Sequence, residues 1–470
     1  MQHIHEECGV FGIFNRNEES LDTAKTVYYA LYALQHRGQE ACGIAVNDHN
    51  LINLHKDLGL VHEVFDENLL AHMPGGIAIG HVRYSTTGGN NRRNIQPLGV
   101  DYIKGSLVIA HNGNISNAAV LRKELERQGA IFQCTSDTEV IAFLIAKERL
   151  NTPSVEEAVS RVLPRLEGSF SLLVMSPSKL IAARDSKGMR PLCMGKLEDS
   201  VLFASESCEL DAIGAAFERD VAPGEMIVVE QQGQRSIRWA PECDHKDCAL
   251  CIFEHIYFAR PDSVIDGQSV YNARIEAGRI LARTHPVQAD LVIGVPDSGL
   301  VAAIGFAQES GIPYGEGLVK NRYIGRTFIQ PTQSGRESAV SIKLSPLKES
   351  VRGKRVVMVD DSIVRGTTMR QIVELLKKAG AAQVHVRISA PEFLWPCYYG
   401  TDIDDRSHLA SVLYTHDELC SRIGADSLGF LPLEQVEAIA GDSALGFCKA
   451  CFSGQYPWPV PTQADKTAFE

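Results

Sequence analysis

The chain has 470 residues, 44% of them hydrophobic and 22% charged, and a formal net charge of −12. This composition is typical of a globular protein, and the length predicts two domains rather than one core. The acidic balance argues against a general nucleic-acid-binding protein, whose binding face is usually basic. We find neither a run of about 18 apolar residues nor the apolar segment of a secretory signal, so we expect a cytoplasmic protein without a membrane span.

Residues 8 to about 235 are expected to form an antiparallel sheet system that helices cover. Short apolar or alternating segments are bounded there by Gly, Asn or Asp, which is typical of strands that turns separate. A helix is predicted over 136–150, because Ser136 and Glu139 stand at the positions of a capping box. The predicted strands cover 8–14, 43–48, 76–84, 106–113, 169–175 and 225–230.

From about residue 270 the pattern changes to strand, loop, helix and strand, which predicts a parallel sheet. The polar segment 236–255 separates the two halves. The predicted strands are 290–295, 355–359 and 384–389, and the helices between them are 301–310 and 369–380. In the second helix one face is apolar, formed by Met369, Ile372, Val373 and Leu376.

The most specific motif in the chain is RVVMVDDSIVRGTT, residues 355–368. Asp360 and Asp361 follow a predicted parallel strand, at the end where such sheets place their ligands. The small residues after them open onto a helix, whose N–H groups and hydroxyls suit a phosphate. Adjacent carboxylates suit ribose hydroxyls or a divalent ion beside a phosphate. For any single one of these residues, a solvated strand-to-helix turn is the alternative.

This motif resembles the phosphoribosyl pyrophosphate (PRPP) motif of the type I phosphoribosyltransferases. The resemblance implies that Thr367 and Thr368 hold the 5-phosphate, and it identifies VPDSG, residues 295–299, as the pyrophosphate loop. The segment KNRYIGRTFIQP has three cations in seven residues and predicts a lid over a polyanion, with a solvated basic loop as the alternative. The implied PRPP-binding residues are Asp297, Ser298, Lys320, Tyr323, Arg326, Lys343, Asp360, Asp361, Ser362, Val364, Arg365, Gly366, Thr367 and Thr368, with Ser298, Asp360 and Asp361 as Mg²⁺ ligands.

The chain begins MQHIHEECGVFGIF, with seven mostly polar residues before Cys8. A lone cysteine before an apolar run is usually a core residue. If residues 1–7 are removed, however, the α-amino group of Cys8 is freed to act as a base. That group titrates near ~7.7–8.0, well below a lysine at ~10.4, so it can accept the thiol proton. The sequence therefore predicts a propeptide over 1–7 and Cys8 as a nucleophile.

The strings CGVFGI, LQHRGQEACGI, GHVRYSTTG, AHNGNI and SDTE together resemble the glutamine amidotransferase domain of the N-terminal nucleophile hydrolases. Joined to the PRPP motif, they resemble the glutamine–PRPP amidotransferase family over nearly the whole chain. The resemblance implies an α+β domain of the αββα sandwich type at 8–238. An α/β type I phosphoribosyltransferase domain with a parallel sheet is expected at 255–470, including a C-terminal cluster-binding segment.

The resemblance also assigns roles in the first domain. Cys8 is the catalytic nucleophile, and the Asn112 side chain with the Gly113 N–H forms the oxyanion hole, where charge develops on the amide oxygen. The implied glutamine-binding residues are Arg83 for the α-carboxylate, Asp137 for the α-ammonium group, Thr86 nearby, and Arg37 close to Cys8. For each residue taken singly there is an alternative, namely a helix start at Asp137 and a turn at Asn112.

Twelve cysteines in a reducing compartment favour metal binding or catalysis over disulfides. Spacing alone suggests a zinc site of Cys248, Cys251, Cys448 and Cys451, although thiolates also hold iron–sulfur clusters. The resemblance implies a [4Fe–4S] cluster, in a subclass with a cleaved propeptide, on Cys251, Cys397, Cys448 and Cys451, with no role for Cys243 or Cys248. The remaining cysteines, expected to be small hydrophobic residues, are Cys42, Cys134, Cys193, Cys208 and Cys420.

The resemblance implies a two-site reaction. Cys8 releases ammonia from glutamine, and ammonia displaces pyrophosphate from PRPP to give 5-phosphoribosylamine, the first committed step of purine synthesis. A channel that forms when the lid near 320–330 closes, feedback inhibition by purine nucleotides and a homotetramer are likewise implied. Two alternatives are another glutamine-dependent synthase, such as the hexosamine-forming enzyme, and a non-catalytic nucleotide sensor. The PRPP motif argues against the first.

Overall fold

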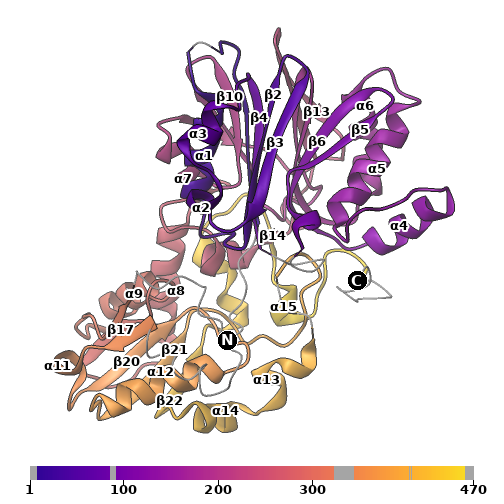
Figure 1. The fold of residues 1–470 in the computed structure, drawn as a ribbon. Coiled ribbons are helices and arrows are strands. Elements are labelled where there is room, and N and C mark those ends of the chain that lie inside the picture. The colour runs from indigo at the N-terminus through magenta and orange to yellow at the C-terminus, as the bar shows by residue number, and fades with distance from the viewer. Residues whose placement is uncertain are drawn as a thin grey trace.

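The structure is a computed structural model and describes residues 8–18, 20–84, 91–321, 343–401, 403 and 405–460. Figure 1 shows two lobes, one built from the first half of the chain and one from the second. The first lobe contains two large sheets, whereas the second is built around a smaller sheet flanked by helices. In the described part of the chain, no helix is long and apolar enough to cross a membrane.

The described strands of the first lobe pair antiparallel throughout both sheets, as the sequence predicts. One sheet has the order β11-β9-β10-β1-β4-β2-β3, and the other has the order β13-β12-β8-β7-β6-β5. The predicted strands are confirmed as β1, β2, β4, β6, β7 and β12. The bounds are β1 Gly9–Phe14, β2 Ala41–Asp48, β3 Leu51–Leu58, β4 Ile77–Arg83, β5 Leu98–Tyr102, β6 Gly105–Ile115, β7 Gly168–Ser176, β8 Lys179–Arg184, β9 Cys193–Leu197, β10 Ser200–Ala204, β11 Ala216–Asp220, β12 Glu225–Glu230 and β13 Gly233–Arg238.

Three apolar clusters show that the first lobe has four layers. Between the sheets, Val10 and Ile79 of the first sheet pack with Val108 and Leu173 of the second. A second cluster lies between the first sheet and α1, and a third lies between the second sheet and α5. This arrangement confirms the predicted αββα sandwich. The helices are α1 Thr23–Ala33, α2 Val61–Val64, α3 Glu67–Ala71, α4 Ala118–Arg127, α5 Asp137–Arg149, α6 Val155–Val162 and α7 Ser207–Ala212.

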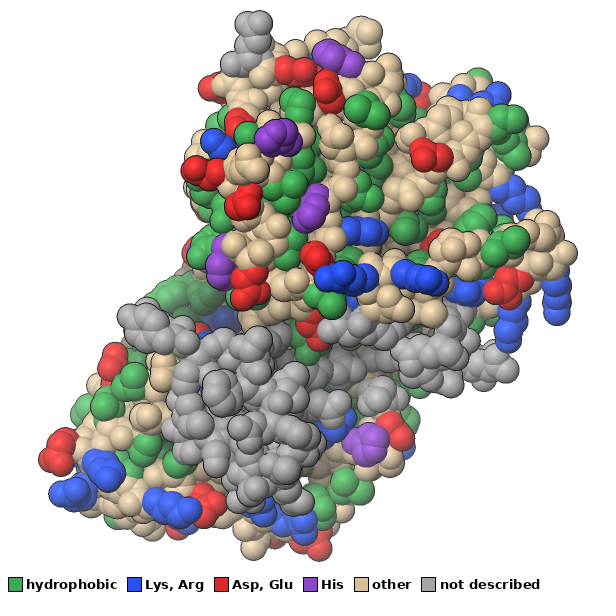
Figure 2. All heavy atoms as spheres, in the orientation of Figure 1, with side chains coloured by type: hydrophobic (Ala, Val, Ile, Leu, Met, Phe, Trp, Pro, Cys, Tyr) green, Lys and Arg blue, Asp and Glu red, His purple; other side chains and the backbone are tan. Residues whose placement is uncertain are grey.

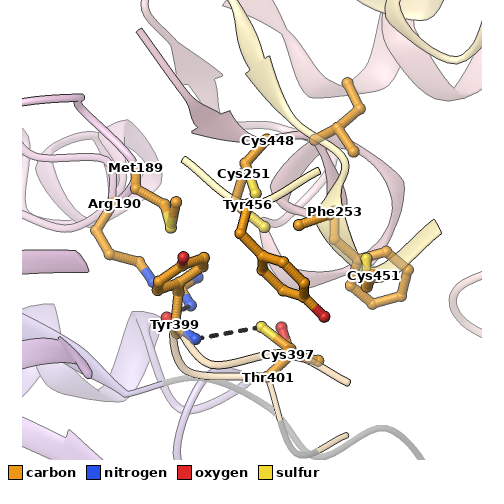
Figure 3. A pocket seen from close by; sticks show the side chains of 12 residues that line it. Met189, Arg190, Cys251, Phe253, Cys397, Tyr399, Thr401, Cys448, Cys451 and Tyr456 are labelled. Carbon is orange, nitrogen blue, oxygen red and sulfur yellow. Dashed lines mark hydrogen bonds between the residues drawn. The ribbon is translucent and has the colours of Figure 1, made fainter. Parts of the chain in front are cut away.

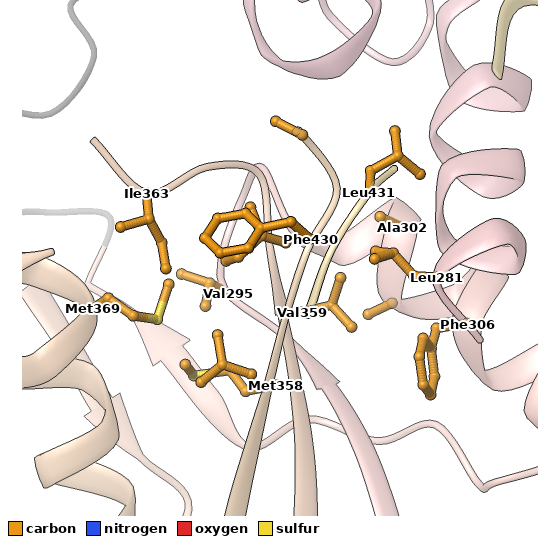
Figure 4. Packing of buried hydrophobic residues seen from close by; sticks show 14 of the residues in the cluster. Leu281, Val295, Ala302, Phe306, Met358, Val359, Ile363, Met369, Phe430 and Leu431 are labelled. Atoms are coloured by element: carbon orange, nitrogen blue, oxygen red, sulfur yellow. The ribbon is translucent and has the colours of Figure 1, made fainter. Parts of the chain in front are cut away.

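The second lobe contains the predicted parallel sheet, with the strand order β17-β20-β21-β22. Its central strands are buried along nearly their whole length, as expected when helices cover both faces. Figure 4 shows Met369 packing on one face of this sheet and Phe306 on the other. The elements are β17 Leu291–Gly294, β20 Arg355–Asp360, β21 Gln383–Ile388, β22 Ser427–Phe430, α8 Val270–Thr284, α9 Leu300–Ser310, α11 Lys348–Val351, α12 Thr367–Lys378, α13 Ala410–Leu413 and α14 His416–Ile423.

Short elements join the lobes and flank the second sheet. The pair β14 and β23 is parallel and brings residues 250–251 next to 447–448. A π-helix, η3, follows β14 and is enclosed between the lobes. The bounds are β14 Leu250–Cys251, η3 Glu254–Phe258, β15 Val264–Ile265, β16 Gln268–Ser269, β18 Leu318–Lys320, β19 Leu344–Pro346, β23 Phe447–Cys448 and α15 Ala450–Ser453.

Two local predictions have different outcomes. The apolar face of α12 is confirmed, because Met369, Ile372, Val373 and Leu376 are its buried residues. The predicted capping box at α5 is only half right. Ser136 is the N-cap and accepts from the N–H of Thr138, but Glu139 accepts from the N–H groups of Gln133 and Cys134, at 2.8 and 2.9 Å. Glu139 therefore holds the preceding loop instead of the N-cap backbone.

Charged side chains of both signs lie on the face of the molecule that Figure 2 shows. Among the described residues of the upper lobe, acidic side chains are scattered over the surface, and several basic ones lie along its lower edge.

Candidate active sites

Cys8 is held just before β1, where separate contacts fix its backbone and its thiol. Nε of Arg37 donates to the Cys8 carbonyl at 3.0 Å, and the Cys8 thiol donates to the Tyr84 carbonyl, with Sγ and O 3.3 Å apart. A Cβ at Gly9 would lie 2.1 Å from buried Leu34, so a larger residue there would displace the packing under Cys8. The nucleophile predicted from the sequence is therefore well ordered.

The N–H of Gly113 lies on an edge of β6 that none of the described strands covers at this position. N–H groups of alternate residues point to the same edge of a strand. On this edge the His111 N–H donates to Oε1 of Gln96 at 2.7 Å, and the Ile115 N–H donates to Oδ2 of Asp137 at 3.0 Å. The Gly113 N–H lies between these two groups on the same edge. The neighbouring strand β5 does not reach it, since β5 pairs with β6 only as far as Ile109. It is thus placed as a hydrogen-bond donor for a ligand.

Asn112 is fully buried, and within the described residues neither its Oδ1 nor its Nδ2 has a hydrogen-bond partner. An unsatisfied buried amide costs about 1–3 kcal/mol, so such a group is expected where a ligand completes the bonding. His81 of β4 donates to the His111 carbonyl at 3.2 Å and so brings the Cys8 end of β4 against β6. Gly113 has φ +143°, and a Cβ there would lie 2.1 Å from the Ser169 carbonyl oxygen, so only glycine fits.

Arg83 and Asp137 provide the two charges expected for a free amino acid. Arg83 ends β4 next to Tyr84, and Asp137 begins α5; both are buried. Oδ1 of Asp137 lies 3.7 Å from Nδ1 of His111. Burial lowers the pKa of His111, so this histidine is neutral near pH 7 and leaves the Asp137 charge for a ligand. Thr86 lies outside the described residues.

Arg37 lies beside Cys8, as the sequence predicts, but its guanidinium faces protein carboxylates. Besides the bond to Cys8, Nη1 donates to Glu206 at 2.7 Å, and Nη1 and Nη2 donate to the two oxygens of Glu254, each at 2.8 Å. Arg37 is 1% exposed. The structure therefore makes Arg37 a residue that orders Cys8.

In the second lobe Asp360 and Asp361 lie at the carboxyl end of β20, against the 295–299 loop. The Ser298 hydroxyl donates to Oδ1 of Asp360 at 3.3 Å, and the Ser362 hydroxyl donates to Oδ2 of Asp361 at 2.5 Å. Burial, and then the neighbouring Asp361 charge, raise the pKa of Asp360 well above its usual value. A carboxyl in this state is stabilised as an anion when a cation or hydroxyl donors bind beside it.

The phosphate loop continues into the positive end of α12. Gly366 has φ +77° and is the N-cap, so the first N–H groups of the helix, at Thr367 and Thr368, are free of helical partners. A pocket of ≈ 400 Å³ adjoins this turn and contains three arginine side chains. Its lining residues are Arg365, Gly366, Thr367, Arg370, Tyr414, Leu419, Arg422 and Ile423.

The remaining predicted PRPP residues are only partly described. Nζ of Lys320 lies 2.5 Å from Oδ2 of Asp297, so the first lid residue contacts the predicted pyrophosphate loop. The Asn321 N–H donates to the Lys343 carbonyl at 2.8 Å, which places Lys343 beside the same strand pair. The Val364 carbonyl accepts from the N–H of Ala410 at 2.7 Å, so α13 supports the phosphate loop. Tyr323 and Arg326 lie outside the described residues.

Four cysteines from three segments surround one pocket between the lobes (Figure 3). Cys251 and Cys448 are partners in the β14–β23 pair, and the Tyr399 N–H donates to Sγ of Cys397 at 3.4 Å. Burial, and then the neighbouring Cys397, raise the pKa of Cys448 to about 12. Burial and the other three thiols likewise raise the pKa of Cys451 well above its usual value. The four cysteines named by the resemblance are thus close enough to affect one another.

The other cysteines lie away from this pocket. The Cys248 thiol donates to the Cys243 carbonyl at 3.4 Å, and neither residue lines the pocket. The set of four cysteines that spacing alone suggests includes Cys248, so the pocket does not bring that set together. Burial raises the pKa of the thiols expected to be hydrophobic residues, at Cys42, Cys134, Cys193, Cys208 and Cys420. Among the described residues, no three or more His, Cys, Asp or Glu side chains, the four pocket cysteines included, are arranged to hold a single metal ion.

Known proteins resemble each half and the whole of the chain. A model of the glutamine amidotransferase domain matches residues 81–212, and a model of the phosphoribosyl transferase domain matches residues 269–391. Amidophosphoribosyltransferase of Methanocaldococcus jannaschii is 48% identical over 465 residues, which cover 96% of this chain and 98% of the relative. The chain belongs to the amidophosphoribosyltransferase family.

Other amidophosphoribosyltransferases agree in sequence and in structure. The Bacillus subtilis relative is 47% identical over 462 residues, 97% of this chain and 95% of that protein. The chain also matches the solved structure of glutamine PRPP amidotransferase from B. subtilis complexed with ADP and GMP. The match covers 98% of this chain and 100% of the B. subtilis chain, with 45% sequence identity and a TM-score of 0.91. The two-domain fold is therefore confirmed, and the hexosamine-forming alternative is excluded.

Several polar residues near the sites were not predictable from the sequence patterns. Gln96 accepts a hydrogen bond from the N–H of His111 at the edge of β6, and Glu206 and Glu254 bind Arg37. Arg190 reaches the cysteine pocket and also binds Glu254. Each is a single residue without a motif around it. A charged side chain inside an otherwise apolar segment, such as Glu254 in CIFEHIYF, is the only signal that would have drawn attention.

Proposed function

We propose that the protein transfers the amide nitrogen of glutamine to PRPP, forming 5-phosphoribosylamine, pyrophosphate and glutamate. This is the first committed step of de novo purine biosynthesis. Membership of the amidophosphoribosyltransferase family supports this activity. The observations that support the proposal most are found together in one chain. Cys8 is held by Arg37, the buried Asn112 amide has no hydrogen-bond partner among the described residues, and Ser298 contacts the first of two paired aspartates.

The glutaminase half-reaction follows from the first site. We propose that residues 1–7 are removed, so that the α-amino group of Cys8 takes the thiol proton. The thiolate attacks the side-chain amide carbon of glutamine, and Asn112 Nδ2 with the Gly113 N–H stabilises the oxyanion. The α-ammonium returns the proton to the departing ammonia, and water then hydrolyses the glutamyl thioester. Arg83 and Asp137 bind the carboxylate and the ammonium group of glutamine.

The synthase half-reaction follows from the second site. We place the 5-phosphate of PRPP at the N-terminus of α12 and its ribose hydroxyls at Asp360 and Asp361. The oxygen donors Ser298, Asp360 and Asp361 are of the type that Mg²⁺ prefers, and the ion would supply positive charge to the departing pyrophosphate. Lys320 would add to that charge. Ammonia then forms the C1–N bond as the C1–O bond to pyrophosphate breaks.

The cysteine pocket suits an iron–sulfur cluster. Four thiols around an enclosed, largely apolar pocket provide the ligand type and number of a [4Fe–4S] cluster. We therefore propose that Cys251, Cys397, Cys448 and Cys451 hold such a cluster in a structural role. Purine nucleotides are proposed as inhibitors, because a nucleotide's ribose 5-phosphate suits the PRPP loop and the B. subtilis relative is complexed with ADP and GMP. We also propose that the protein is cytoplasmic and assembles as a homotetramer.

One assay separates the enzyme from a nucleotide sensor that has lost turnover. Anaerobically purified protein is given glutamine, or ammonium chloride at high pH, with PRPP and Mg²⁺, and glutamate and pyrophosphate are measured. We expect pyrophosphate from both nitrogen donors and glutamate release that PRPP stimulates. Intact-mass measurement should show Cys8 at the N-terminus. Nucleotide binding without turnover, in protein whose N-terminus is confirmed as Cys8, would instead favour the sensor.

A further inference from the structure

A buried chain of charged side chains connects the second half of the sequence to the nucleophile. Both oxygens of Glu254 accept from Arg37, at 2.8 Å, and Oε1 also accepts from Nη1 of Arg190 at 3.1 Å. Arg37 in turn donates to the Cys8 carbonyl at 3.0 Å. Glu254, Arg37 and Arg190 are each at most 1% exposed. A single arginine thus separates Glu254 from the residue that attacks glutamine.

The charge on Glu254 is maintained despite its burial. Burial alone would raise the pKa of Glu254, but Arg37 and Arg190 outweigh it and lower the pKa, so the carboxylate is ionised at neutral pH. Removing one partner from a buried ion pair leaves the other charge uncompensated, which is costly. A bidentate pair also fixes the plane of the guanidinium. Glu254, together with Glu206, therefore determines where Arg37 can place its Nε donor.

Glu254 is itself held by the second lobe. It begins η3, and three carbonyls along and just after this helix, those of His255, Tyr257 and Ala259, accept from Arg274 of α8 at 3.0, 2.9 and 2.7 Å. Arg190 also donates to the Tyr399 carbonyl at 2.6 Å, in the loop that bears Cys397. Arg274 thus holds η3 from the second lobe, and Arg190, a residue of the first lobe, connects Glu254 to the loop of Tyr399 in the second lobe.

We infer that Glu254 is a positioning residue for Cys8, through which the second lobe and the cysteine pocket fix the geometry of the glutaminase nucleophile. Glu254 acts through its contacts with Arg37 and Arg190. Its effect should be on the rate of attack by Cys8, since the groups that bind glutamine, Arg83 and Asp137, are separate side chains. The inference rests on the proposed function, because it assigns Glu254 a role in that reaction.

The test uses Glu254→Gln in the full-length, cluster-loaded enzyme. Gln keeps the size of the side chain but loses the charge and one acceptor oxygen. We expect kcat for glutamine-dependent synthesis to fall at least tenfold, while KM for glutamine and the ammonia-dependent rate stay within twofold of wild type. Glu374→Gln, at an exposed pair with Lys378, is the matched control and should leave all three values unchanged.

Each outcome decides the inference. A glutamine-dependent kcat within twofold of wild type overturns it, and so does a parallel fall of the glutamine-dependent and ammonia-dependent rates, which would indicate a structural role only. If Glu254→Gln does not fold, Glu254→Asp, which keeps the charge but cannot reach both guanidinium nitrogens, is judged by the same comparison. Failure of the proposed function would be distinct, since the wild type would then form no pyrophosphate from either nitrogen donor.

Discussion

Cys251 and Cys448 are direct partners across the parallel strands β14 and β23, although they come from opposite ends of the second half of the sequence. Cys397 and Cys451 line the same pocket. The pocket also contains Arg190, which binds the Glu254 that holds Arg37. Metal binding at the four cysteines is thus expected to stabilise the contact between the lobes as well as the local loops.

The first prediction concerns these cysteines. Cys397→Ser should lose most of the iron and acid-labile sulfide of anaerobically purified protein, because a serine hydroxyl is a poor ligand for a cluster. Its melting temperature should also fall. Cys248→Ser is the matched control, since Cys248 lies outside the pocket and should retain the full metal content. Equal loss in both variants, or one zinc per chain without sulfide in wild type, would contradict the assignment.

The second prediction concerns the oxyanion site. Asn112→Ala should lower kcat for glutamine hydrolysis by about 10²–10³-fold, the usual effect of removing one oxyanion donor. Ammonia-dependent synthesis should persist, because the second site is untouched. Asn117→Ala is the matched control; that amide donates to the Arg165 carbonyl at 2.9 Å, away from Cys8. A glutaminase rate for Asn112→Ala equal to that of the control would remove Asn112 from the mechanism.

The third prediction concerns pH and Asp360. Because burial and Asp361 raise the pKa of Asp360, the folded ligand-free protein holds a proton there that the unfolded chain loses above about pH 3.9. Stability should therefore fall as pH rises through this range, until the folded group also ionises. Asp360→Asn removes this cost. At pH 7 the free energy of unfolding of the variant should therefore be larger than that of wild type, and at pH 4.5 the difference should be smaller.

The same substitution should abolish PRPP binding, because a neutral amide cannot replace the carboxylate beside the ribose and the cation. Denaturant titrations at pH 4.5 and pH 7, together with PRPP titration, check both effects. A stability difference that does not grow with pH would show that Asp360 is ionised in the free protein.

Much of the fold depends on local sequence patterns and was therefore predictable. The strand, loop and helix of residues 355–378 are specified by an apolar run, small residues and one apolar helix face, and the structure has them as β20 and α12. The pairing of Arg37 with Glu254 was not predictable, because no pattern connects residues so far apart in sequence. Cys397 also lacks a CxxC spacing, so only resemblance named it. Glu139 shows that even a local motif fails when a loop offers better donors.

We expect nitrogen to pass within one chain from the Cys8 site to the PRPP site. The most direct test supplies glutamine labelled with ¹⁵N in its side-chain amide, PRPP, Mg²⁺ and an equal concentration of unlabelled ammonium near neutral pH. The product should contain ¹⁵N with little dilution from the medium, in a one-to-one ratio with glutamate. Product nitrogen drawn equally from ammonium, or glutamate release without product, would contradict the account.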